Sequence, residues 1–125
     1  MTRYRAVFLG VAAILLAVAG WCYVRAHSAT TMTTPYQAVL LTNGSAYFGR
    51  LEGLGTPFPV LREVYYVQSR PGQDPKQPVN VLVKRGKEWH GPDRMILNAS
   101  MIVFVEPVNP GSRVSQLIAE AAAAK

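Results

Sequence analysis

An uncharged, apolar run near the N-terminus constrains this chain more than any other feature of its sequence. The run extends from Ala6 to Val24 and lies between Arg5 and Arg25. A helix over it is about 28 Å long at ~1.5 Å per residue, close to the thickness of the hydrocarbon core of a bilayer. Only about a hundred residues follow, and a domain of that size buries a single modest core. We therefore expect residues 1–26 to form a transmembrane anchor.

The expected anchor contacts the lipid bilayer along its length and at one end. Trp21 and Tyr23 lie near its C-terminal end, where amphipathic rings favour the headgroup level. A cleaved secretory signal is the alternative, since Val24-Arg25-Ala26 resembles a cleavage site, although signals have shorter apolar stretches of about 7–15 residues. The side chains that we expect to contact lipid are Ala6, Leu9, Leu15, Leu16, Trp21 and Tyr23.

The charges on either side of the run predict its orientation. Arg3, Arg5 and the amino terminus precede it, whereas Arg25 and His27 follow it. The positive-inside rule then favours a cytoplasmic N-terminus and an extracytoplasmic C-terminal domain, with the anchor in the inner (cytoplasmic) membrane. Because the one cysteine, Cys22, lies within the anchor, the exported domain forms no disulfide and folds on its core alone.

The net charge of +6 does not predict a nucleic-acid-binding protein. Three of the thirteen basic residues flank the anchor, and the rest of the chain carries ten basic residues against seven acidic ones. A nucleic-acid interface needs basic residues clustered with stacking aromatics. We therefore expect no nucleic acid among the partners.

The remaining sequence divides into a linker, a small β domain and a C-terminal helix. Residues 27–35 are small and polar and end at a proline, which is typical of a linker. Residues 36–108 contain short runs of strand-favouring residues separated by turn residues, the pattern of all-β barrels and sandwiches. The expected strands are Tyr36–Thr42, Ser45–Glu52, Val60–Gln68, Val79–Arg85, Arg94–Leu97 and Met101–Glu106.

Two glycines in the first strand pair predict its local geometry. Asn43-Gly44 between apolar runs is the strongest short-range signal for a hairpin, and we expect a type I′ turn, in which both central residues have positive φ. Gly49 lies inside the returning strand, where glycine otherwise weakens pairing. We expect a sharp bend or a bulge at that position.

Residues 109–125 contain the expected C-terminal helix. Pro107–Gly111 breaks the chain, Ser112 can cap a helix, and the helix is expected from Arg113 to Ala124. A helix of about twelve residues is marginal alone, so its apolar stripe docks either on the open end of the barrel or on a partner protein. The stripe consists of Val114, Leu117, Ile118 and Ala121.

The segment Val39–Leu51 resembles the first motif of Sm-like small barrels, which has an apolar strand, an Asn-Gly turn and a glycine-bent second strand. Met95–Val105 is similar to the closing strand pair of that family, in which a short turn separates two apolar strands. The resemblance implies a mainly β fold, with a small Sm-type β-barrel or sandwich between an N-terminal transmembrane helix and a short C-terminal helix. Sm-like proteins bind RNA between protomers of a ring, but the RNA-contacting loops have no clear match here. The resemblance therefore implies the architecture and not that activity.

Most of residues 36–108 also resembles a family of small bacterial membrane-anchored proteins of unassigned function. Because that family has no assigned role, the resemblance implies membrane anchoring and no activity. It is carried by Tyr36-Gln37-Ala38-Val39, Leu41-Thr42-Asn43-Gly44, Tyr47-Phe48-Gly49, Tyr65-Tyr66-Val67-Gln68 and His90-Gly91-Pro92.

The polar segment Lys84–Arg94 is the strongest candidate for a functional site. It holds four basic residues, two acidic residues, Trp89 and His90 between two expected strands. His90 could act as a base or a ligand oriented by Glu88 or Asp93, but no nucleophile or second histidine accompanies it. A structural loop or a recognition surface is expected instead, because Trp and Arg dominate binding hot spots. The expected partner-binding residues are Tyr66, Trp89, His90 and Arg94.

No residue pattern predicts catalysis, a metal or a cofactor. His27 and His90 lie in different segments, and no cysteine lies outside the anchor, so the sequence contains no metal-ligand spacing. The serines occur without a G-x-S-x-G elbow, and neither a phosphate loop nor a dinucleotide fingerprint occurs. We expect no catalytic, cofactor-binding or metal site.

Together these patterns favour a non-enzymatic, single-pass membrane protein. We expect an accessory or scaffolding subunit of a larger membrane complex, which binds other membrane-protein subunits through its β domain. The alternative is a membrane-tethered barrel that binds a ligand, a peptide or a glycan. A membrane-tethered hydrolase comes third, because no catalytic set of residues supports it.

Overall fold

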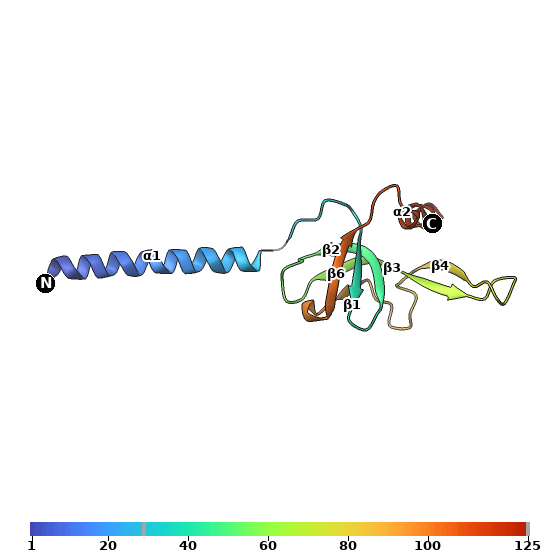
Figure 1. The fold of residues 1–125 in the computed structure, drawn as a ribbon, viewed down its shortest axis with the longest axis horizontal. Coiled ribbons are helices and arrows are strands. Elements are labelled where there is room, and N and C mark those ends of the chain that lie inside the picture. The colour runs from blue at the N-terminus through green and yellow to red at the C-terminus, as the bar shows by residue number, and fades with distance from the viewer. Residues whose placement is uncertain (29, 125) are drawn as a thin grey trace.

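The structure, a computed structural model, describes residues 1–28 and 30–124. A long N-terminal helix, a sheet of six antiparallel strands and a C-terminal helix follow one another along the chain (Figure 1). Helix α1 spans Thr2–His27, and α2 spans Arg113–Ala123. The strands are β1 Gln37–Leu41, β2 Ala46–Glu52, β3 Val60–Arg70, β4 Val79–Lys84, β5 Arg94–Ile96 and β6 Ile102–Pro107, and a 3-10 helix, η1, spans Ala99–Met101.

Helix α1 projects from the domain without packing on it (Figure 1). None of the described α1 side chains is buried, and Phe8 and Leu9 are 79% and 72% exposed. Good helix formers such as Ala and Leu fill the segment, and no proline interrupts it. The hydroxyl of Ser28 donates to the carbonyl oxygen of Val24 at 2.6 Å where the helix ends. By length and composition, α1 is able to cross a membrane.

The six strands form an open sheet. Their order is β4-β3-β2-β1-β6, and β5 pairs with the first residues of β3. Among the described residues, β4 and β6 are the two ends of this order, and no ladder joins them. The barrel closure that we expected is therefore not formed. The sheet stays open because residues 66–70 of β3 pair with β4 alone. These two strands extend away from the rest of the sheet as a two-stranded ribbon.

The core is small and comes from β1, β2, both sides of the bend in β3, and the residue that follows β5. Partly buried side chains such as Tyr47 and Met95 pack around it. The buried residues of the cluster are Val39, Leu51, Leu61, Val64 and Leu97.

Gln37 is a buried polar residue whose amide is fully used in the core. Its side chain is 1% exposed. Oε1 accepts a hydrogen bond from the backbone N–H of Leu51 at 2.8 Å, and Nε2 donates to the carbonyl oxygen of Thr34. The ladder between β1 and β2 reaches only as far as Gly49, opposite Gln37, so the Leu51 N–H lies beyond the end of β1. The Gln37 amide therefore takes the place of a backbone partner from β1. A buried N–H left without a partner costs about 1–3 kcal/mol.

The Asn43-Gly44 hairpin forms as expected, but its turn differs from the expected type I′. The N–H of Leu41 donates to the carbonyl of Ser45 at 2.9 Å, which closes a three-residue loop. Gly44 has φ +83°, whereas Asn43 is not among the described residues with positive φ. A three-residue hairpin loop needs one left-handed residue at its end, and Gly44 supplies it. The Asn43 side chain instead accepts the N–H of Ser45 at 2.9 Å.

The irregularity expected at Gly49 is confirmed. The register between β2 and β3 shifts between Phe48 and Arg50. A β-carbon at Gly49 would lie 2.7 Å from the carbonyl oxygen of Arg62 and 2.8 Å from Cγ of Leu61. Glycine is needed there because the two strands approach too closely for any side chain.

Helix α2 begins and ends within one residue of the expected bounds. Ser112 caps it, since its hydroxyl accepts the N–H of Ser115 at 3.2 Å. Ile118 is 4% exposed and lies beside Val108 and Tyr36. Ile118 of the stripe therefore docks on the chain's own β domain, while Val114 and Leu117 are half-buried and Ala121 is exposed. The sheet that receives Ile118 is open rather than the end of a closed barrel.

Candidate functional site

Glu63 lies where β3 exchanges one neighbouring strand for another. Residues 60–62 pair with β5 and residues 65–70 pair with β4, while β2 occupies the opposite edge of β3. Glu63 has φ +49° and is the one non-glycine residue with positive φ in the part of the chain that the structure describes. The left-handed conformation is costly for a residue with a β-carbon. The bend in β3 is therefore held in place by other contacts.

The Glu63 carboxylate supplies those contacts. Its Oε2 accepts from the hydroxyl of Tyr36 at 2.7 Å and from Nε of Arg50 at 2.6 Å. The guanidinium of Arg50 also lies over the Tyr36 ring, 5.0 Å from its centroid. The hydrogen bond from Tyr36, followed by that from Arg50, lowers the pKa of Glu63, while burial raises the pKa of the Tyr36 hydroxyl. Tyr36, Arg50 and Glu63 therefore connect the start of β1 to the bends of β2 and β3.

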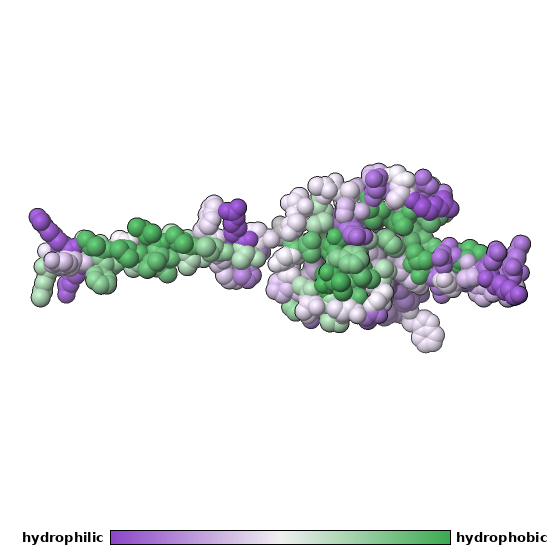
Figure 2. Space-filling model, in the orientation of Figure 1, coloured by the Kyte–Doolittle hydropathy of each residue, from purple (hydrophilic) through white to green (hydrophobic). Residues whose placement is uncertain are grey.

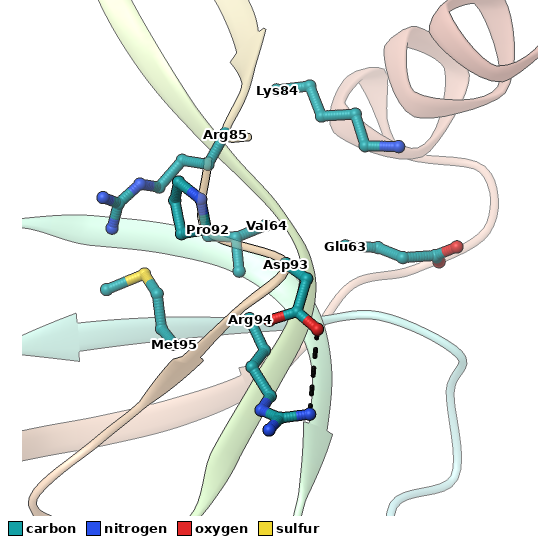
Figure 3. A pocket seen from close by; sticks show the side chains of 8 residues that line it. All are labelled: Glu63, Val64, Lys84, Arg85, Pro92, Asp93, Arg94 and Met95. Carbon is teal, nitrogen blue, oxygen red and sulfur yellow. Dashed lines mark ion pairs between the residues drawn. The ribbon is translucent and has the colours of Figure 1, made fainter. Parts of the chain in front are cut away.

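A cavity of about 210 Å³ opens between β4 and β5 beside this bend (Figure 3). The N–H of Arg85, just after β4, donates to the carbonyl of Val64 on β3 at 2.8 Å and so fixes one wall of the cavity. Figure 3 shows Lys84 and Glu63 extending to one side of the cavity and Arg85 to the other. The polar groups diverge rather than converge, and an enzyme site needs several groups aimed at one reacting atom. The lining residues are Glu63, Val64, Lys84, Arg85 and Pro92–Met95.

The chain between β4 and β5, residues 85–93, forms a hydrogen-bonded turn that we call the Trp89 loop. Nε of Arg85 pairs with Oε1 of Glu88 at 2.8 Å, and the N–H of Gly86 donates to its Oε2 at 2.7 Å. The carbonyl of Glu88 accepts the N–H of Gly91 at 2.7 Å. These bonds fix the base of the loop, while the Trp89 side chain at its tip is 107% exposed and so fully in solvent.

An aromatic depression of about 190 Å³ lies at the base of the Trp89 loop, lined by Tyr47, Tyr66, Arg85 and Glu88. The rings of Tyr47 and Tyr66 meet edge to face with 6.5 Å between centroids, and the Arg85 guanidinium lies 5.9 Å from the centroid of Tyr47. Tyr65 is buried and Tyr66 is half-buried, because neighbouring strand residues face opposite sides.

The four expected partner-binding residues fall into three places. Trp89 and His90 share the exposed tip of the loop. Tyr66 lies at its base, reached through Arg85. Arg94 lies on β5 beside the first cavity and pairs with Asp93 at 3.7 Å (Figure 3). Trp89 and His90 therefore lie together at the tip of the loop, while Tyr66 lies at its base and Arg94 lies on β5.

Tyr36, Arg50 and Tyr47 were not among the sequence-based candidates. Tyr36 and Arg50 meet at Glu63, which is 27 residues from Tyr36, and nothing in a glutamate's local sequence indicates positive φ. Gly49 was the available signal, since it marks the irregularity in the pairing of β2 with β3. The described residues contain no group of three His, Cys, Asp or Glu side chains able to hold a metal ion.

Comparisons with known proteins do not add to this geometry. No protein-family model matches the sequence, and no curated protein is significantly similar to it. The functional argument therefore depends on the residues of this chain.

The Trp89 loop is expected to loosen in acid. Hydrogen bonds from Arg85 and from the Gly86 N–H lower the pKa of Glu88 to about 2, from an ordinary value of about 4.3. The ionised Glu88 carboxylate stabilises the folded loop fully when the pH is above the ordinary pKa of about 4.3. This stabilisation is lost as the pH falls from about 4.3 toward 2 and the carboxylate becomes protonated. In a Trp21→Phe background, the fluorescence anisotropy of Trp89 should fall across that range. Glu88→Gln should give low anisotropy already at pH 7, and an unchanged pH profile in that variant contradicts the assignment.

Proposed function

We propose that the chain is a non-enzymatic, single-pass membrane protein that acts as an accessory or scaffolding subunit of a larger complex. Helix α1 anchors it in the inner (cytoplasmic) membrane, with the N-terminus in the cytoplasm. The β domain lies on the other side and binds other membrane-protein subunits. No cofactor, metal or nucleic acid takes part.

The observation that carries this proposal is the complete exposure of α1. An apolar helix that has no side chain buried by the described residues of its own chain needs a bilayer or other helices to cover it. Leu15 and Leu16, at the middle of the run, are 64% and 74% exposed. Trp21 and Tyr23 are exposed near the end that leads into the domain, where aromatic rings favour the interface.

The Trp89 loop supports the second half of the proposal. A fully exposed tryptophan on a hydrogen-bonded turn loses little conformational entropy when a partner covers it, and such residues are frequent binding hot spots. The diverging polar groups of the cavity beside it favour recognition over catalysis. The Asn-Gly hairpin and the bent β2 resemble the first motif of Sm-type barrels, but the sheet is open, and the proposal includes no RNA binding.

Native gel electrophoresis tests the proposal. The tagged full-length chain, extracted in mild detergent, should migrate in a discrete large complex whose companions are the same in each preparation by mass spectrometry. Trp89→Ala should reduce the amount of that complex at least tenfold, because truncating a hot-spot residue costs about 2 kcal/mol or more.

A matched control separates the loop from general surface changes. Val103 on β6 is 54% exposed and distant in the sheet order from the Trp89 loop, so Val103→Ala should leave the complex intact. Migration of the wild-type chain as a monomer or a small homo-oligomer overturns the accessory-subunit proposal.

A further inference from the structure

The loop between β2 and β3, residues 53–59, exposes an apolar side chain. Phe58 is 64% exposed and stands between two prolines, which restrict the backbone on either side of it. Pro59 is buried, and its carbonyl accepts the N–H of Leu97 at 2.8 Å, so this part of the loop is bonded to the chain that follows β5. Ile96, the last residue of β5, is 63% exposed. Phe58 and Ile96 therefore expose apolar surface on adjacent, hydrogen-bonded segments.

The linker holds this loop close to the end of α1. The N–H of Thr30 donates to the carbonyl oxygen of Leu54, which belongs to the loop. Helix α1 ends at His27, and three residues of chain span at most about 11 Å. The loop is therefore held near the C-terminal end of the helix. Figure 1 shows it at the end of the domain that faces α1.

The segments at this end of the domain carry no charged side chain. No Asp, Glu, Lys or Arg occurs in residues 28–49, 53–61 or 95–105, which include the linker, the loop and the chain after β5. Glu52 and Arg62 flank the loop and pair with each other at 3.2 Å. Figure 2 shows mainly apolar and weakly polar surface at the end of the domain that faces α1. The loop therefore brings no charge of its own next to lipid.

The expected position of α1 places this end of the domain at the membrane surface. The apolar run ends at Val24, and His27 lies about 5 Å beyond it at ~1.5 Å per residue. The headgroup layer on each side of a bilayer is roughly 5–8 Å thick. When the apolar run lies in the hydrocarbon core, the helix ends within the headgroup layer. The bond between Thr30 and Leu54 then holds the loop beside that layer.

We propose that Phe58 and Ile96 contact the bilayer that α1 crosses, at the boundary between headgroups and acyl chains. This inference rests on the membrane anchoring proposed for α1 and adds a second contact, made by the folded domain. Exposed Phe and aliphatic side chains gain free energy at this boundary. Since the anchor keeps the domain at the membrane, the contact needs little affinity of its own. Lipid is favoured over a partner protein because the anchor brings it within reach of the loop in every molecule.

Quenching of tryptophan fluorescence by brominated lipid tests the proposal. The full chain with Trp21→Phe, Trp89→Phe and Phe58→Trp has a single tryptophan, in the loop. It is reconstituted into phosphatidylcholine vesicles, with or without bromine on the acyl chain near the glycerol, and the vesicles are floated on a density gradient. Interfacial segments bury their apolar side chains about 5–10 Å into the boundary, so brominated lipid should lower the fluorescence of the floated chain at least about twofold.

A matched control measures the affinity of tryptophan itself for lipid. Val79, at the start of β4, is 51% exposed and lies in the ribbon that points away from α1 (Figure 1). Val79→Trp in the same background should be almost unaffected by the brominated lipid. Ile96→Trp repeats the test at a second exposed position, which keeps it valid if Phe58→Trp disturbs the loop.

The two proposals fail in different ways. A chain that floats but shows no quenching at position 58 or 96, or no more than Val79→Trp shows, overturns this inference and leaves the anchor in place. Shielding of these positions from acrylamide without quenching by lipid overturns it too, by assigning the surface to a second copy of the chain. A chain that does not float with the vesicles overturns the membrane anchoring, and this inference with it.

Discussion

Replacing Gly49 by alanine should destabilise the β domain by about 1–2 kcal/mol. The added β-carbon would lie 2.7 Å from the Arg62 carbonyl oxygen and 2.8 Å from Cγ of Leu61. Leu61 is fully buried and Arg62 is paired on β3, so neither can move without opening the sheet. Overpacking of this kind costs about 1–3 kcal/mol, and the lower entropy of the unfolded alanine chain offsets about 0.4–1 kcal/mol.

The measurement is urea unfolding of the full chain in detergent micelles, followed by near-ultraviolet circular dichroism. Gly111→Ala is the matched control, because the nearest atom to its β-carbon is Asn109 Oδ1 at 3.5 Å and its φ is not left-handed. It should change the free energy of unfolding by less than about 0.5 kcal/mol. Equal stabilities of the two variants would show that β2 and β3 do not approach as closely as the structure indicates.

Local signals in the sequence predict the elements of this fold well. Asn43-Gly44 gives the hairpin, Gly49 gives the bulge, and Ser112 gives the start of α2, because each depends on the conformation of a few adjacent residues. The predicted type I′ turn at Asn43 was wrong, because the hairpin has a three-residue loop. The choice between two- and three-residue loops depends on the register with which Leu40 and Ala46 meet, and the dipeptide alone does not encode it.

Sheet closure depends on contacts that no local pattern contains. β3 continues to Arg70, two residues beyond the expected strand, and its last five residues pair with β4 only. All six expected strands are present. Their course, however, changes at Glu63, a residue with left-handed backbone whose side chain is bound by Tyr36 and Arg50. This cluster joins three strands and is recognisable only once the bulge at Gly49 has aligned them.

The candidate site shows the same division between local and distant information. Trp89, His90 and their turn were predictable, since one segment contains them all. The aromatic depression lined by Tyr47 and Tyr66 was predicted in part. The sequence indicated that one of the adjacent residues Tyr65 and Tyr66 faces outward, but it did not indicate that Tyr47 lies beside Tyr66. The docking position of α2 was not predicted, because it follows from Ile118 meeting Val108 and Tyr36 rather than from the stripe itself.

Placing arginines at Leu15 and Leu16 should abolish membrane insertion of the chain. Both side chains lie near the centre of the apolar run and are exposed. An arginine at the centre of a membrane helix costs about 2.5–3.5 kcal/mol, and each leucine lost removes about 0.5 kcal/mol of favourable transfer, so the double variant loses about 6–8 kcal/mol. After carbonate washing of membranes, the wild-type chain should remain in the pellet at its full mass, and the Leu15→Arg/Leu16→Arg chain should not.

The matched double variant Leu15→Ile/Leu16→Ile should remain in the pellet, because isoleucine is as favourable as leucine in the bilayer. A wild-type chain that has lost its first residues and is soluble would identify α1 as a cleaved signal, and a double arginine variant retained in the pellet would show that α1 is held by something other than lipid.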